Sequence, residues 1–89
     1  MRAVITVIGK DTVGILAKVS TICAEHNANV IDVTQTVMQD MFAMIMLTDI
    51  SNMNSDLSVI VDKMNELGKK QQLSIHVMHE DIFNSMHTI

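Results

Sequence analysis

The order in which strand-like and helix-like patterns follow one another is the feature that most constrains the fold of this chain. Runs of alternating or β-branched apolar residues predict four strands, and apolar residues at helical spacing predict two helices between them. The expected strands cover residues 2–8, 30–38, 41–50 and 71–79. The expected helices follow the turn that ends at Gly14 and the polar linker that ends at Ser55. The predicted order is strand, helix, strand, strand, helix, strand.

The short turn Gln39-Asp40 joins the second and third strands, so these two strands are expected to pair as an antiparallel hairpin. The run 41–50 is apolar on both faces, which is typical of a central strand. Right-handed crossovers then favour a four-stranded antiparallel sheet in the order 4-1-3-2, with both helices on one face. The predicted fold is a ferredoxin-like βαββαβ sandwich of the α/β (α+β) class.

The second strand is expected to be half-buried, because its two faces differ in polarity. Its mostly apolar face comprises Ile31, Val33, Gln35 and Val37, and its mostly polar face comprises Val30, Asp32, Thr34, Thr36 and Met38. The strand contains no Pro or Lys, and Asp32 is its only charged residue. An edge strand of this kind can pair with a second copy of itself, so we expect a homodimer.

Polar residues and glycines define the expected helix ends. Asp11 or Thr12 is a candidate cap for the first helix, and Asn27 is a plausible left-handed residue after it. Gly68 is expected to close the second helix.

Beyond an expected domain of residues 1–80, the tail 81–89 is predicted to form a short helix that packs on the domain or on a second subunit. Its apolar stripe comprises Ile82, Phe83, Met86 and Ile89.

Composition excludes several classes of function. The chain has 10 acidic and 6 scattered basic residues and a net charge of −4, so it offers no basic stripe for nucleic-acid phosphates. Its hydrophobic fraction is 48% with only two aromatic residues, so nine Met and the aliphatic residues must build an adaptable core. Cys23 is the only cysteine and lies on the apolar side of the first helix, which favours a reduced, cytoplasmic setting. No apolar run approaches the length of a membrane span.

Other functions known for this fold class lack their residues here. The first and third strands carry Ile, Val and Met where RNA-binding domains need aromatic side chains for base stacking. The turn 10–12 lacks the two cysteines of a soft-metal carrier, and Arg2 is the only arginine available to an acylphosphatase-type enzyme. His76 and His79 are three residues apart on a strand and should project to opposite faces. We therefore expect no catalytic residue, metal site or cofactor.

The junction between the first strand and the first helix is the most informative stretch. It reads Gly9-Lys10-Asp11-Thr12-Val13-Gly14-Ile15, a small polar turn flanked by glycines. The free N–H groups of the first helical turn and the helix dipole favour an anion at such a junction. Gly14 would permit a close approach of ligand to backbone. A carboxylate or phosphate is therefore a plausible ligand, and an ordinary helix cap is the simpler alternative.

This junction, followed by a helix and then by Asn27-Ala28-Asn29-Val30-Ile31, resembles the ACT domain. The resemblance covers residues 1 to about 80, and the nearest type is the small stand-alone ACT protein similar to the N-terminal part of the glycine cleavage system repressor. Many members have Pro where this chain has Val13, so its turn is expected to be less rigid.

The resemblance implies a regulatory module without catalytic activity that holds an amino acid or similar zwitterion between two copies. The implied site residues are Lys10, Asp11, Thr12, Val13, Gly14 and Ile15 of one copy and Asn29, Val30 and Ile31 of its neighbour. The ligand carboxylate would accept the N–H groups of Gly14 and Ile15, and its ammonium would pair with Asp11. The alternative is a module that only dimerises or docks on an unidentified protein, and the apolar third strand and the tail stripe favour that alternative.

Overall fold

The computed structural model describes residues 1–10 and 14–86 of the 89-residue chain. Its elements are β1 (Arg2–Gly9), α1 (Ile15–Glu25), β2 (Asn29–Met38), β3 (Met41–Asp49), α2 (Leu57–Gln71), β4 (Ser74–His79) and α3 (Glu80–Met86). This order and the short C-terminal helix confirm the fold predicted from the sequence. Of the predicted tail stripe, Ile89 lies outside the described residues. None of the helices in the described part of the chain is long and apolar enough to span a bilayer.

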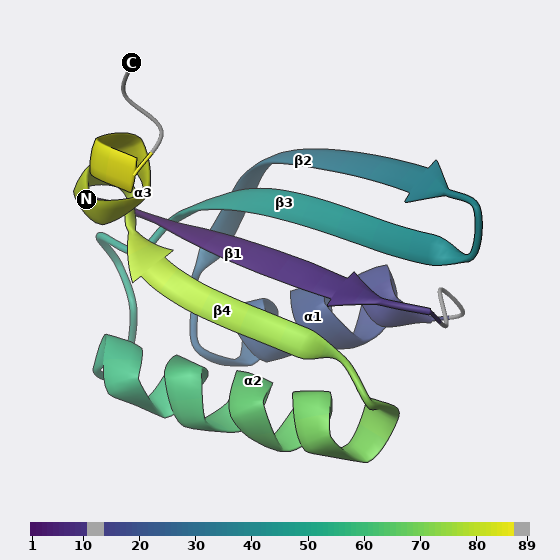
Figure 1. Cartoon of the computed structure of the whole chain (residues 1–89). Helices are drawn as coiled ribbons and strands as arrows, with labels where there is room; N and C mark the ends of the chain where they lie inside the picture. The colour runs from purple at the N-terminus through teal and green to yellow at the C-terminus, as the bar shows by residue number, and fades with distance from the viewer. Residues whose placement is uncertain (11–13, 87–89) are drawn as a thin grey trace.

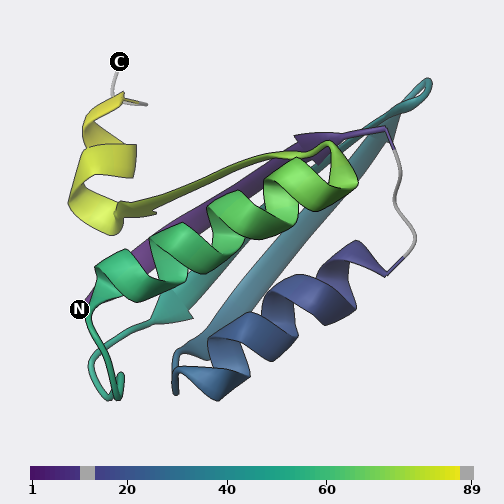
Figure 2. The same cartoon turned by 90° about the horizontal axis from the view of Figure 1, so that it is seen from below.

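The four strands form one antiparallel sheet in the order β2-β3-β1-β4, so the predicted strand order is confirmed (Figure 1). Both α1 and α2 cover the same face of this sheet, as Figure 2 shows from below. We call this the helix side and the other face the open face. The edge strands are β2 and β4, and β3 lies between β1 and β2 as its two-sided apolar pattern predicts.

The core lies between the helix side of the sheet and the two helices. The innermost side chains on β1 and β3 include Ile5, Val7, Met44 and Met46, each at most 2% exposed. They pack against buried residues of α1 and α2, chiefly Val19, Cys23, Ile60 and Met64. Flexible methionines fill the volume that rings would fill elsewhere, because the chain has only two aromatic residues.

The alternation expected along β2 is wrong at its start. A β-bulge between Val30 and Asp32 leaves Ile31 outside the register, because Val30 pairs with Thr48 and Asp32 with Leu47. The extra residue reverses the alternation, so Val30 joins Val33 against the core while Asp32 lies on the open face. Ile31 is left 47% exposed. The prediction of Ile31 inward and Val30 outward therefore fails.

The start of α1 and the end of α2 also differ from those predicted from the sequence. Gly14 occupies the N-cap position of α1 with a φ of 73°, so neither Asp11 nor Thr12 does. The second helix continues to Gln71, one turn past Gly68, and a left-handed Gln72 ends it. A Cβ on Gly68 would lie 2.8 Å from the carbonyl oxygen of Leu73, so this glycine serves close packing of the returning chain. The left-handed Asn27 after α1, with a φ of 60°, is confirmed.

The helix α3 packs on the open face, against β1 and β4. An ion pair fixes its start: the Arg2 guanidinium lies 2.6 Å from the Glu80 carboxylate, and Arg2 Nε donates a second bond of 3.1 Å to it. Val4 faces away from α1 and α2 yet is only 4% exposed. The short helix therefore shields one end of the open face and leaves the end near the β2–β3 hairpin uncovered (Figure 1).

Candidate functional site

The predicted site residues lie in two groups at opposite ends of α1. Gly14 and Ile15 are at its N-terminal end, beside the end of β1, and Lys10 is exposed just beyond that strand. Asn29, Val30 and Ile31 begin β2, after the C-terminal end of α1. Asp11, Thr12 and Val13 lie outside the described residues.

The start of α1 has the chemistry expected of an anion site. The Gly14 carbonyl accepts the first helical bond, from the Lys18 N–H at 3.0 Å. The N–H groups of the first helical turn have no partner within a helix, and they point out of its N-terminus. Among the described residues, and leaving its chain neighbours aside, a Cβ built on Gly14 would meet the Lys18 side chain alone, at 3.9 Å. Space beside the turn is therefore open to a ligand, and the positive φ explains why glycine occupies the position.

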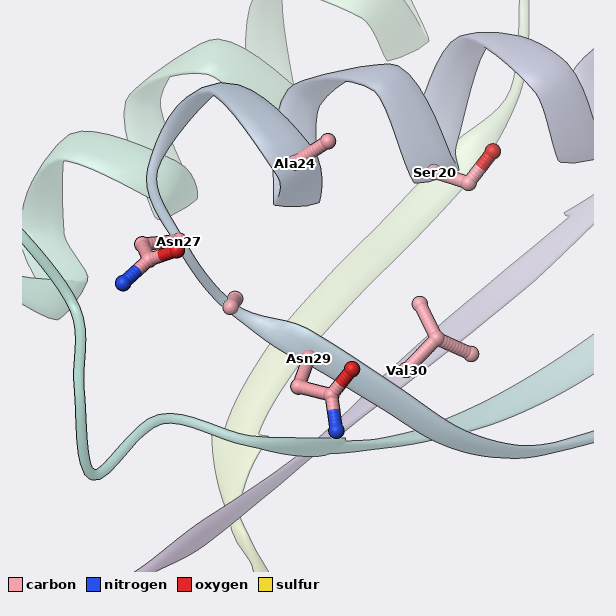
Figure 3. A pocket seen from close by; sticks show the side chains of 6 residues that line it. Ser20, Ala24, Asn27, Asn29 and Val30 are labelled. Atoms are coloured by element: carbon pink, nitrogen blue, oxygen red, sulfur yellow. The ribbon is translucent and has the colours of Figure 1, made fainter.

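A hollow of about 390 Å³ lies at the other group, between α1 and the start of β2 (Figure 3). Its walls are formed by Ser20, Ala24, Asn27, Ala28, Asn29 and Val30. Figure 3 shows Ser20 and Ala24 on the helix above Asn29 and Val30 on the strand. The volume is within the usual range of small-ligand pockets.

Ser20 and Ala24 line the hollow although neither is among the site residues predicted from the sequence. A signal for them exists: both are small and four residues apart, and each follows a buried residue of α1, Val19 or Cys23. This spacing places both side chains beside the buried stripe, on the flank of the helix that faces β2. Their small size leaves the volume of the hollow open.

The floor of this hollow is held in place by contacts between the end of α1 and the loop before α2. Asn27 Nδ2 donates to the Asn52 carbonyl at 2.8 Å, and the Asn54 N–H donates to the His26 carbonyl at 3.2 Å. The His26 ring nitrogen Nδ1 lies 3.1 Å from the Ser55 hydroxyl. These bonds tie the chain just before Asn29 to the rest of the domain.

One chain does not bring the two groups together. The helix α1 has 11 residues, so its ends are about 16 Å apart. Gly9, just before the turn, pairs with Phe42 near the β2–β3 hairpin, whereas Asn29 pairs with Asp49 at the other end of the sheet. A ligand that contacts both groups therefore requires two copies of the chain.

Cys23 is part of the core and outside the hollow. Burial raises the pKa of its thiol to about 11 from the ordinary 9.0. A neutral, fully buried thiol is neither a nucleophile nor a metal ligand at neutral pH. Its contribution to folding stability is complete below pH 9 and is lost as the pH rises toward 11, because the unfolded thiol ionises first.

We expect Cys23 to resist alkylation in the native protein. At pH 8 its thiolate fraction is about 100-fold lower than that of an exposed thiol with a pKa of 9.0, and burial also blocks the reagent. Mass spectrometry after iodoacetamide treatment should show one adduct in denatured protein and almost none in native protein over the same time. Equal labelling in both states would contradict the burial.

The histidines of β4 do not converge. His76 pairs with Thr6 and His79 with Ala3, so they lie on opposite faces of the sheet. The His76 ring nitrogen Nε2 lies 3.2 Å from the Ser74 hydroxyl. Across residues 1–10 and 14–86 no three side chains of metal-binding type gather in one place.

The described geometry is that of a small ferredoxin-like domain with a ligand-sized hollow beside an edge strand. The chain belongs to the ACT domain family, whose model matches residues 2–78. This membership supports a regulatory ligand-binding module.

Individual relatives agree with this family. A UPF0237 protein of Clostridium perfringens is 54% identical over 89 residues, which cover all of both chains. The structure of an ACT domain protein from Streptococcus pneumoniae superposes with a TM-score of 0.79 at 31% identity, covering 100% of this chain and 97% of that one. A proposed glycine cleavage system transcriptional repressor has a TM-score of 0.71 at 23% identity, covering 85% of this chain and 43% of its own. The last similarity concerns the fold alone.

Proposed function

We propose that this chain is a cytoplasmic amino-acid sensor without catalytic activity, which binds its ligand between two copies. The turn around Gly14 of one copy and the segment Asn29–Ile31 of the other form the site. The observation that carries the proposal is the separation of these two groups along α1, with a ligand-sized hollow at one of them.

Pairing of two β2 edges across a two-fold axis would unite the groups. Paired antiparallel, the start of one β2 lies beside the hairpin end of the other. The hairpin end is also where Gly14 lies, because β1 ends opposite Phe42. The start of the partner's β2, with its Asn29 position, would therefore approach this turn.

Exposure along the same side supports this arrangement. Val37 is 65% exposed on the helix side of β2, and Leu16 is 40% exposed on α1. Ala17, Thr21 and Ala24 of α1 are also exposed, and their small side chains permit close approach of a second copy. The edge of β2 lacks Pro and Lys, which usually protect exposed edges.

The ligand class follows from the groups at the two halves. A carboxylate would accept the N–H groups at the start of α1, where the helix dipole also favours negative charge. The Asn29 amide offers both a donor and an acceptor to the polar end of the ligand. Asp11 lies outside the described residues, and we propose that its carboxylate pairs with the ligand ammonium, beside Lys10, Thr12 and Val13.

We expect a selective rise in melting temperature when the purified protein is screened against the twenty amino acids and several keto acids at millimolar concentration. A ligand at 100 times its dissociation constant adds about 2.7 kcal/mol, or roughly 10–20 °C for a domain of this size. Asn29→Ala should weaken binding at least about tenfold, since the side chain is exposed and its loss leaves the fold intact. Asn65→Ala on the exposed side of α2 is the matched control.

A screen without any shift would contradict the sensor. The uncovered apolar part of the open face favours a second candidate, a module that only dimerises or docks on another protein. That function predicts normal assembly with no response to any amino acid, and Asn29→Ala would then change nothing.

A further inference from the structure

The hairpin half of the open face is apolar and uncovered. Ten large hydrophobic residues among the described residues are substantially exposed, and six of them lie on the open face or on α3. Four belong to the hairpin half, namely Ile8, Met38, Met41 and Ile45, and two to α3, namely Ile82 and Met86. An apolar face of this extent typically belongs to an interface.

Charge separates this half from the rest of the surface. The open-face positions of the hairpin half are Thr6, Ile8, Thr34, Thr36, Met38, Met41, Ala43, Ile45, Ser74 and His76, and none is Lys, Arg, Asp or Glu. The charged residues of this face, Arg2, Asp32 and Asp49, lie toward the other end. The hairpin half therefore adds no charge of its own to a contact with α3 of a second copy, where Glu80 is already paired with Arg2 and Asp81 is the remaining acid.

The shape of the face suits a second copy of the same chain. The helix α3 rises from one end of the open face, and no helix covers the hairpin half at the opposite end (Figures 1 and 2). A groove of about 410 Å³ separates them, with Ile8, Ile45 and His76 on the sheet and Phe83 and Met86 on α3 among its walls. A two-fold axis in the plane of the face would place each α3 over the hairpin half of the other copy.

The available area is sufficient for a stable contact. The molecule measures 36 × 34 × 19 Å, so its two broad faces are the open face and the helix-covered face. A standard interface requires about 800 Å² from each partner, which is most of one broad face of this size. Methionine side chains on both halves can adapt to the packing.

We propose that two copies of this chain pack open face to open face, with α3 of each copy covering the hairpin half of the other. This contact is separate from the pairing of β2 edges. Together the two contacts build a four-chain assembly with dihedral symmetry.

The test is sedimentation of two variants on the two halves of the contact. Ile45→Lys places a charge in the centre of the hairpin half, and Ile82→Lys places one on the exposed side of α3. Both residues are about half exposed in a single chain, so circular dichroism should show an unchanged fold. Burying an unpaired lysine should raise the dissociation constant of the contact at least about 100-fold. We expect each variant to have half the mass of the wild type, and Ser58→Lys on α2 to keep the full mass.

A second measurement identifies the halves that meet. In the double variant Ile82→Cys/Met41→Cys, a short bismaleimide should link two chains, whereas Ser58→Cys should give no covalent dimer. Cys23 does not interfere because it is buried.

Three results would overturn the proposal. The first is an unchanged mass in both lysine variants, and the second is loss of assembly in Ile45→Lys alone, which would exclude α3. The third is strong binding of an apolar dye to the wild type, which would mean that the face is open to a different partner. The ligand response of Ile45→Lys separates the open-face contact from the proposed amino-acid site. If the site lies between copies paired through β2, this variant still binds its amino acid.

Discussion

The double variant Gln35→Lys/Val37→Lys is expected to separate the copies that pair through β2 and to abolish the response to ligand. Both residues face the helix side of β2, opposite Met44 and Phe42, and both are exposed in a single chain. Lysines at an exposed strand edge oppose edge-to-edge pairing, because their charges would lose solvent where the two β2 strands meet.

Lysines at positions 35 and 37 test the pairing of β2 edges and leave the open face of the sheet unchanged. Thr34 and Thr36, which the sequence equally offers, lie on the open face opposite Ile45 and Ala43. Lysines there would disturb both proposed contacts at once. The helix-side positions therefore isolate the edge pairing.

The expected readouts are halved mass in sedimentation and loss of the thermal shift with the amino acid identified in the screen. Ser58→Lys/Asn65→Lys is the matched control, because it adds the same charge at exposed positions of α2. A double variant on β2 that has half the mass but keeps its ligand response would place the site within one copy, and one that keeps its mass would place the pairing elsewhere. Both results contradict the proposal.

The second large effect expected is a loss of folding stability when Met46 is replaced by alanine. Its side chain lies on the central strand β3, faces the helices and is fully buried, in register with Ile5 and Val33. Met46→Ala removes buried contacts and leaves a cavity, at a cost of about 2–5 kcal/mol. For a domain of this size the melting temperature should fall by roughly 10–30 °C.

Urea denaturation of Met46→Ala, Met46→Leu and Met38→Ala would check this expectation. Leucine conserves most of the volume and should cost less than about 1.5 kcal/mol. Met38 is 71% exposed at the hairpin, so its replacement should change the stability of the single domain by about 0.5 kcal/mol or less. Equal losses for Met46→Ala and Met38→Ala would contradict the packing described here.

Local patterns were sufficient to predict most of the fold. The short turn Gln39-Asp40 required a hairpin, and the two-sided apolar run around Met44 required a central strand. With the two helices and right-handed crossovers, these features left one strand order, which the structure confirms. The left-handed Asn27 was also readable from the sequence, because few residue types tolerate that backbone region.

The sequence-based predictions were wrong or incomplete where contacts with distant parts of the chain decide a local conformation. The bulge at Ile31 depends on the register of β2 against β3, which hydrophobic alternation alone does not reveal. Gly68 reads as a helix end, but its role is to admit the Leu73 carbonyl of the returning chain. Ser20 and Ala24 read as ordinary surface positions, and only the packing of α1 beside β2 makes them walls of a hollow.

The sequence by itself determined the order of elements, the strand order and the left-handed Asn27 after α1, because these depend on periodicity, on short connections and on the backbone preferences of single residues. Tertiary structure decided that a ligand-sized hollow forms between α1 and the start of β2, because the hollow depends on how that helix packs beside the strand. It also decided that α3 covers only one end of the open face, because that depends on the Arg2–Glu80 ion pair and on packing against β1 and β4. Relations of this kind arise only when separate segments pack together.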